Sequence, residues 1–160
     1  MQLATEAMED LRNISSGLAL PELADRPLGD VLELAVSRHR AITGADVHAT
    51  IGPLAADVSM AVKTCAYRVV QEALNNAVRH GNPSQQRVDA RMKGPALVIT
   101  VSNDAASDST TGPDDARERL GLRGMRSRVE ALGGTLDVTI GRRTLVHAHI
   151  PTDTEPAALV

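Results

Sequence analysis

The 160-residue sequence is nearly free of aromatic side chains, with Tyr67 as the only one and no Trp or Phe. Proteins that bind single-stranded nucleic acids usually stack the bases on aromatic rings, so this mode of binding is excluded. The formal net charge of −3 also provides no general attraction for a phosphate backbone. We therefore expect no nucleic-acid partner and a core built from Leu, Val, Ile, Ala and Met.

Cysteine is almost absent too, because Cys65 is the only one and no disulfide can form within the chain. This is compatible with a reducing compartment. The opening stretch MQLATEAMED lacks the basic and apolar regions of a signal peptide, and no apolar run is long enough to span a bilayer. We expect a cytoplasmic segment without direct membrane contact, although it could be cut from a longer, membrane-tethered chain.

The residues that are present, 42% hydrophobic and 23% charged, are typical of one soluble globular domain. Hydrophobic periodicity and Gly/Pro breaks predict its helices and strands. The expected helices are 28–41, a long one ending at 80, and 122–132; the expected strands are 47–51, 87–92, 96–102, 135–140 and 145–150. This order predicts an α+β fold, in which a mixed but mostly antiparallel sheet carries helices on one face.

The long helix contains the stretch YRVVQEALNNAVRHG, residues 67–81, and we expect Asp57 or Ser59 to cap its start. Asn is a poor helix former, yet two occur in the middle. At 100° per residue, Glu72 and Asn76 lie one turn apart on a stripe away from the apolar arc. Two oxygen ligands so placed could hold Mg²⁺, and Arg79 and His80 could meet phosphate oxygens. The alternative is a solvated polar face.

A second segment, LGLRGMRSRVEALGG at residues 120–134, contains glycines where a loop is expected to enter a helix. Glycine permits close backbone approach, and amides at a helix N-terminus favour an anion. The alternative here is an ordinary turn. Before this segment come a strand ending in Asn103 and Asp104 and a polar stretch at 105–119 that is long for a simple connection. This order of elements strengthens the case for a ligand site.

In this order the chain resembles the catalytic ATP-binding domain of sensor histidine kinases, in the ATPase superfamily shared with gyrase B, Hsp90 and MutL. YRVVQEALNNAVRHGNPS resembles the N box, and GLRGMRSRVEALGGTLDV resembles the G2 box with its helix. LRNISSGLALPEL resembles the end of the dimerisation helix and the linker that precede the domain. The resemblance covers nearly all of residues 8–151 and is greatest to the subfamily paired with NarL/LuxR-type response regulators. It implies a two-layer α/β sandwich of the GHKL (Bergerat) type that binds ATP and Mg²⁺.

The resemblance also implies roles for individual residues. Asn76 matches the asparagine that holds Mg²⁺, and Glu72 matches the acid that orients a water of the metal or acts as the catalytic base. Arg79 and His80 occupy positions where basic residues approach the phosphates, and Thr144 matches a strand threonine near adenine. Residues 105–119 match the ATP lid. The G2-box residues, which border the phosphates and nucleotide, are Gly121, Leu122, Gly124 and Met125.

The chain departs from this family pattern in the G1 box, which reads Asp-x-Gly-x-Gly and whose Asp accepts a hydrogen bond from the adenine amino group. Here Asn103 stands at the Asp position, and Ala105 and Ser107 replace the glycines. An Asn carbonyl can still accept that bond but without the help of a charge. Asp104 is the alternative reader, although strand alternation turns it to the other face. Arg119 replaces the first G2 glycine, and we expect weakened nucleotide binding.

The phosphoacceptor of the family is a histidine in a His-Asp context on a dimerisation helix. None of the five histidines here has that context; they are His39, His48, His80, His147 and His149. The chain is therefore not expected to phosphorylate itself. We expect residues 1–27 to be the end of a dimerisation helix with its linker, 28–152 to be the catalytic domain, and 153–160 to be a loose tail.

The leading interpretation is thus a histidine kinase catalytic domain that transfers the γ-phosphoryl group of ATP to a histidine outside this segment. The expected partners are the phosphoacceptor histidine domain of the same kinase, which would be a homodimer, and a NarL/LuxR-type response regulator. One alternative is a degenerate domain that serves dimerisation or regulation, favoured by Asn103 and the missing glycines. Another is a protein-serine kinase of the anti-sigma type, which the linker LRNISSGLALPEL argues against.

Overall fold

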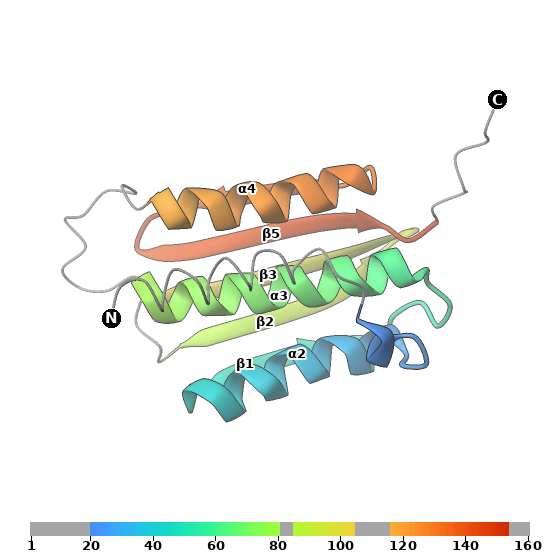
Figure 1. Ribbon diagram of the computed structural model, residues 1–160, viewed down its shortest axis with the longest axis horizontal. Helices are drawn as coiled ribbons and strands as arrows, with labels where there is room; N and C mark the ends of the chain where they lie inside the picture. The colour runs from blue at the N-terminus through green and yellow to red at the C-terminus, as the bar shows by residue number, and fades with distance from the viewer. Residues whose placement is uncertain (1–19, 81–84, 105–115, 154–160) are drawn as a thin grey trace.

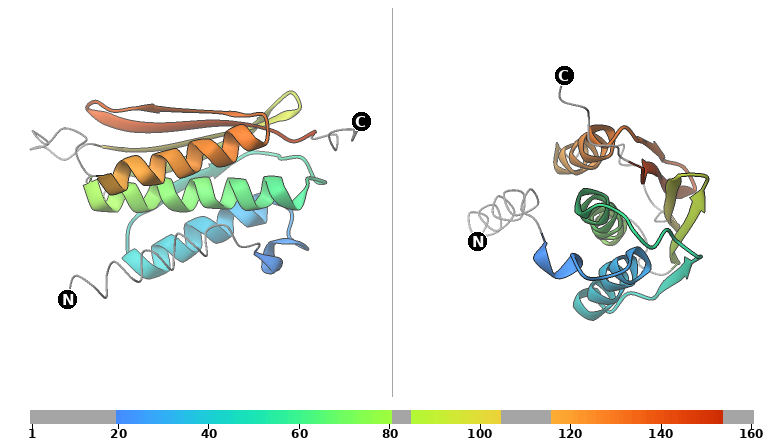
Figure 2. Two further views of the ribbon diagram at one scale, coloured as in Figure 1. Left: turned by 45° about the horizontal axis from the view of Figure 1, so that its top comes forward. Right: turned by 90° about the vertical axis from the view of Figure 1, so that its right-hand side faces the viewer.

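The computed structural model describes residues 20–80, 85–104 and 116–153 and shows an α/β sandwich in two layers (Figure 1). A five-stranded sheet has the strand order β1-β2-β3-β5-β4. Only β1 and β2 run parallel; the other neighbours are antiparallel. Viewed along the layers in Figure 2, the three long helices lie on one face of the sheet. The elements are η1 (Pro21–Leu23), α2 (Leu28–Thr43), β1 (Val47–Ile51), α3 (Met60–His80), β2 (Gln86–Lys93), β3 (Ala96–Asp104), α4 (Ala116–Ala131), β4 (Thr135–Thr139) and β5 (Arg143–Pro151).

The core lies between the sheet and the helices, as the hydrophobic patterns predict. In β3 the alternate residues Leu97, Ile99 and Val101 face the helices and are buried, which follows from the two-residue period of a strand. Cys65 of α3 belongs to this core, where burial raises the pKa of its thiol to about 11. It stays protonated and packs as a small apolar side chain.

Helix α3 crosses the middle of the sheet, and its apolar arc is buried in full. The members of this arc are Val62, Ala66, Val69, Val70, Ala73, Leu74 and Ala77. Ser59 caps the helix, because its Oγ accepts a hydrogen bond of 3.2 Å from the amide of Val62. The predicted helix and its end at His80 are thus confirmed. The described part of the chain contains no helix that is long and apolar enough to cross a membrane.

Helix α4 differs from the prediction at its start. The glycine pattern indicates a loop that enters a helix at Leu122, but the helix begins at Ala116. Gly121 and Gly124 therefore lie inside α4, and the loop interpretation is wrong for them and for residues 116–119. Helix-forming side chains in Ala-Arg-Glu-Arg-Leu explain the earlier start. Residues 105–115, most of the expected lid, lie outside the described residues.

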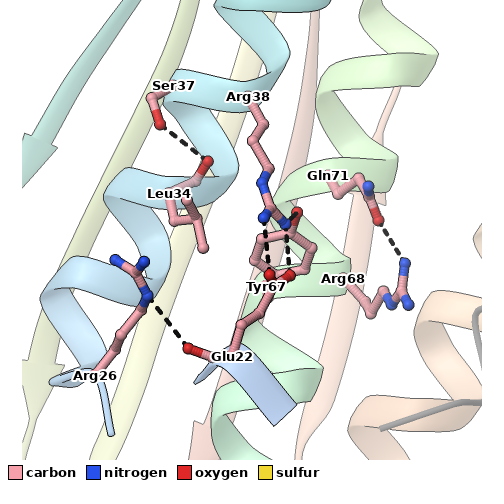
Figure 3. A network of polar contacts seen from close by, with 8 residues as sticks. All are labelled: Glu22, Arg26, Leu34, Ser37, Arg38, Tyr67, Arg68 and Gln71. Atoms are coloured by element: carbon pink, nitrogen blue, oxygen red, sulfur yellow. Dashed lines mark hydrogen bonds and ion pairs between the residues drawn. The ribbon is translucent and has the colours of Figure 1, made fainter. Parts of the chain in front are cut away.

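The segment before α2 is fastened to the helical layer. Leu23 of η1 is buried in the core, and Lys63 of α3 donates a hydrogen bond of 2.8 Å to the carbonyl of Ala24. Arg38 of α2 reaches the carboxylate of Glu22 at 2.8 Å and the hydroxyl of Tyr67 at 3.0 Å (Figure 3). These contacts hold the entry segment against α2 and α3, the helix that carries Glu72 and Asn76.

Candidate nucleotide-binding site

Asn76 stands out in α3 because both polar atoms of its amide, Oδ1 and Nδ2, are buried without a hydrogen-bond partner among the described residues. A buried polar group that lacks a partner costs about 1–3 kcal/mol, so nearly all such groups in native proteins are satisfied. A ligand that supplies the partner would remove this cost. The amide is therefore not part of a solvated polar face, which was the alternative for this stripe.

Glu72, one turn before Asn76, lies against α4. A Cβ atom placed on Gly121 would lie 3.3 Å from Cδ of Glu72 and closer still to its Oε1. A side chain at position 121 would therefore force the Glu72 carboxylate to move, whereas glycine accommodates the carboxylate where it lies. The structure thus brings together a residue of the polar stripe and a residue of the glycine pattern, two segments that are about fifty residues apart in the sequence.

The other residues of the glycine pattern lie along the same helix. Met125 is fully buried in the core, and Leu122 is partly buried against it. Gly124 has ordinary packing, since its nearest side-chain atom is Nη1 of Arg128, 3.8 Å from a Cβ placed there. Backbone amides inside a helix bond to the preceding turn, so an anion meets free amides only at the helix start, before Gly121.

Asn103 and Thr144 are direct partners across β3 and β5. Asn103 is only 6% exposed and lies on the helix-covered face, with Val101 two residues before it. Asp104 points to the opposite face, where its Oδ1 lies 3.0 Å from Nε of Arg143. The pairing therefore places Asn103, and not Asp104, on the side of the sheet that α3 and α4 cover.

The end of α3 carries the two predicted phosphate contacts. Arg79 is exposed, so its guanidinium is open to solvent and to an anion. His80 is the last residue of α3, but its side chain is outside the part of the chain that the structure describes. In Figure 1, α3 ends, β3 ends, and α4 and β5 begin on the same side of the molecule. The element ends that carry Arg79, His80, Asn103 and Thr144 thus lie at one end of the sandwich.

A family model for histidine kinase-, DNA gyrase B- and HSP90-like ATPases matches residues 61–154, more than half of the chain. The chain belongs to this ATPase family. The matched region contains both α3 and α4, and hence both sides of the Glu72–Gly121 contact. The resemblance stated from the sequence is confirmed at the level of the family, and so is the α+β sandwich.

Members of this ATPase family with similar sequences are histidine kinases. The chain is 34% identical to the signal transduction histidine-protein kinase/phosphatase UhpB of Salmonella typhimurium over 59% of this chain and 18% of that protein. It is 28% identical to the oxygen sensor histidine kinase NreB of Staphylococcus carnosus over 93% of this chain and 43% of that one. The chain therefore spans less than half the length of these relatives.

A solved structure of a further histidine kinase has the same fold. The blue-light activated histidine kinase EL346 of Erythrobacter litoralis aligns with a TM-score of 0.64 and 27% sequence identity, over 81% of this chain and 46% of that chain. This likeness over most of the chain supports the overall arrangement of the sheet and helices in this member of the family.

The donors in the site suit Mg²⁺ better than a transition metal. Mg²⁺ is usually held by one or two protein oxygens together with phosphate oxygens and waters, and Glu72 and Asn76 offer a carboxylate and an amide carbonyl. The described residues contain no cluster of three His, Cys, Asp or Glu side chains that could enclose a metal by themselves. His147 and His149 share the open face of the sheet, where Nδ1 of His147 is 3.0 Å from the hydroxyl of Thr100.

Two arginines come close to each other at the seam between α3 and α4. Arg68 of α3 donates a hydrogen bond of 2.9 Å to Gln71, and burial, with the nearby charge of Arg128 in α4, lowers the pKa of Arg68. The sequence places Arg68 on the polar side of α3, but it does not reveal that Arg128 lies beside it. The only signal for Arg128 is the basic character of α4.

The Glu72–Gly121 crossing yields a test. Gly121→Ala should preserve the fold, because alanine gains about 0.5–1 kcal/mol of helix propensity over glycine. The new methyl group should displace the Glu72 carboxylate and weaken Mg²⁺-dependent ATP binding by about tenfold or more, since small misplacements at such sites are costly. Gly29→Ala in helix α2 is the matched control, because a Cβ there would meet only Cγ2 of Ile51 in β1, at 3.9 Å. Equal affinities for ATP in the two variants would refute the role of this crossing.

Proposed function

We propose that the chain is the ATP- and Mg²⁺-binding catalytic domain of a sensor histidine kinase, which transfers the γ-phosphoryl group of ATP to a histidine outside this segment. The observation that carries the proposal is the buried, unpartnered amide of Asn76 one turn from Glu72, which is itself fitted against Gly121. A protein oxygen without a partner, one helical turn from a carboxylate, suits a magnesium ion that also binds phosphate oxygens and waters. The names of the relatives agree with this function.

In this proposal each residue positions the nucleotide. Oδ1 of Asn76 would hold the metal, and Glu72 would orient a water beside it or accept a proton as the catalytic base. Asn103 and Thr144 contact the base, and Arg79 and His80 contact the phosphates. The remaining contacts along the nucleotide come from Gly121, Leu122 and Gly124 of α4, and Met125, which is buried in the core, packs behind them. Mg²⁺ supplies neutralisation of the charge on the phosphate oxygens, so catalysis rests on positioning and electrostatics.

The partners follow from the same proposal. The phosphoacceptor would be a histidine in a dimerisation domain of the same kinase, and residues 1–27 would be the end of that domain with its linker. The kinase would be a cytoplasmic or membrane-tethered homodimer that passes its phosphoryl group to a NarL/LuxR-type response regulator. The contacts of Leu23, Glu22 and Ala24 with the helical layer support a firm connection between such a linker and the catalytic domain.

Titration of the chain with ATP, with and without Mg²⁺, tests this function in two stages. We expect saturable binding that requires Mg²⁺ for full affinity, although weaker than that of relatives with an intact G1 box. A histidine-bearing domain of a relative such as NreB, supplied as a separate chain, should then become phosphorylated on histidine. Absence of binding at millimolar ATP would contradict the kinase function and favour the degenerate, regulatory alternative. Phosphorylation of serine instead would favour the anti-sigma type.

A further inference from the structure

Asn103 places an amide side chain on the inner face of β3. The other residues of β3 on that face are the apolar Leu97, Ile99 and Val101. Its Nδ2 donates a hydrogen bond of 3.2 Å to the carbonyl of the next residue, Asp104. This length is at the long end of the usual range for N–H···O bonds. The local bond is weak enough to be exchanged for a bond to a ligand, so the amide can present either of its polar atoms.

The nearest carboxylate in the sequence, that of Asp104, cannot supply the negative charge that Asn103 lacks on the inner face. Asp104 lies on the opposite face of the sheet and is bonded to Arg143. On the inner face, the cross-strand partner of Asn103 is Thr144, whose hydroxyl can also donate or accept a hydrogen bond. Asn103 and Thr144 therefore form a pair without charge and without a fixed direction of hydrogen bonding.

A carboxylate and an amide read a purine base differently. An ionised Asp only accepts hydrogen bonds, so it pairs with the 6-amino group of adenine and repels a 6-oxo group. An Asn accepts with Oδ1 or, after rotation of its amide, donates with Nδ2. It can therefore pair with a 6-amino group in one orientation and with a 6-oxo group in the other. A site that rejects 6-oxopurines by repulsion from a carboxylate loses that specificity when a neutral Asn replaces the Asp.

We propose that the pair Asn103 and Thr144 makes the base site tolerant of the 6-position of the purine, so that the chain binds a 6-oxopurine triphosphate, ITP, as well as ATP. This inference rests on the proposed function, because it concerns the base of the same nucleotide. It extends that function by naming the substrate class: purine nucleoside triphosphates with either an amino or an oxo group at position 6.

Equilibrium titrations with Mg²⁺-ATP and Mg²⁺-ITP test this inference, because the two nucleotides differ only at the 6-position and its neighbouring ring nitrogen. For the unmodified chain we expect the two Kd values to lie within about tenfold of each other. Asn103→Asp is measured at about pH 8 to keep the carboxylate ionised. This variant should have a lower Kd for ATP and a higher Kd for ITP, so the ratio of the ITP Kd to the ATP Kd should rise by at least about tenfold. Asp104→Asn should leave the ratio unchanged, because that side chain faces away.

Each outcome decides the inference. The inference is overturned if the ITP Kd exceeds the ATP Kd by more than about tenfold in the unmodified chain. It is also overturned if Asn103→Asp does not raise the ratio of the ITP Kd to the ATP Kd. If Asp104→Asn changes this ratio, the base contact belongs to Asp104, and the inference is again overturned. If Asn103→Asp does not fold, the ratio in the unmodified chain decides alone. Failure of the proposed function looks different, because neither ATP nor ITP would then bind at millimolar concentration.

Discussion

Replacement of Asn76 by alanine is expected to abolish Mg²⁺-dependent ATP binding while leaving the protein as stable as before, or more stable. Substitutions around a metal that only affect its indirect contacts already cost about 10–100-fold in affinity. Loss of a direct oxygen ligand should therefore cost about 100-fold or more. Phosphoryl transfer to a separate histidine domain should fall with it, because the metal is needed to neutralise the phosphates.

The expected stability follows from the same observation. Oδ1 and Nδ2 of Asn76 are buried without partners in the described structure, so their removal relieves a cost of desolvation. Alanine is also the better helix former. Together these effects leave the free energy of unfolding unchanged or raise it by about 1 kcal/mol. A residue retained for function at the expense of stability behaves in this way.

Asn75→Ala is the matched control, since it removes the same amide from the neighbouring position of α3 with the same gain in helix propensity. Titration with ATP and urea unfolding should separate the two variants. Asn76→Ala loses Mg²⁺-dependent binding and Asn75→Ala keeps it. Retained binding in Asn76→Ala, or a clear loss of stability, would show that this amide is structural.

Gly134→Ala is expected to destabilise the fold by about 3 kcal/mol, the largest effect on stability that we predict. A Cβ at this position would collide with the carbonyl oxygen of His149 and lie 2.8 Å from Cγ1 of Val129. The carbonyl belongs to the backbone of β5, so a side-chain rotation cannot relieve the clash. Either β4 must separate from β5, or α4 must move away from the sheet.

The tight packing has a structural origin in the end of α4. The amide of Gly134 bonds to the carbonyl of Val129 at 3.0 Å, and that of Gly133 bonds to Glu130 at 2.9 Å. With Gly133 at φ +76, this is the Schellman arrangement that ends a helix. It fixes the position of α4, and hence of Gly121 beside Glu72.

Urea unfolding of two neighbouring variants isolates the clash at Gly134. Gly133→Ala should cost only about 1 kcal/mol, for the left-handed conformation, because no atom lies within 4 Å of a Cβ there. Gly141→Ala, in the β4–β5 turn, has the same open surroundings without the positive φ and should be nearly neutral. Similar losses for Gly134→Ala and Gly133→Ala would contradict the packing argument and leave only the backbone conformation as their common cause.

The sequence predicts most of this fold because its periodicities are clear. The arc of α3 and the alternation in β3 determine which faces are buried, and Glu72 and Asn76 are placed on one stripe by spacing alone. The contact between Glu72 and Gly121 was not predictable in this way, because it depends on how two helices cross. The start of α4 was mispredicted, since glycines are weak evidence for a loop when strong helix formers precede them. The choice between Asn103 and Asp104 likewise required the pairing with β5.

The central claim is that Glu72 and Asn76 of α3 face Mg²⁺-ATP, with Gly121 of α4 packed beside Glu72. Substitution of Mn²⁺ for Mg²⁺ in the complex of the ¹⁵N-labelled chain with ATP tests it most directly, because the paramagnetic ion broadens the amide resonances that lie near it. We predict that broadening centres on residues 72–76 and 121–125 and depends on ATP, while His147 and His149 on the open face of the sheet stay sharp. Broadening centred on those histidines, or absent from residues 72–76, would contradict the account.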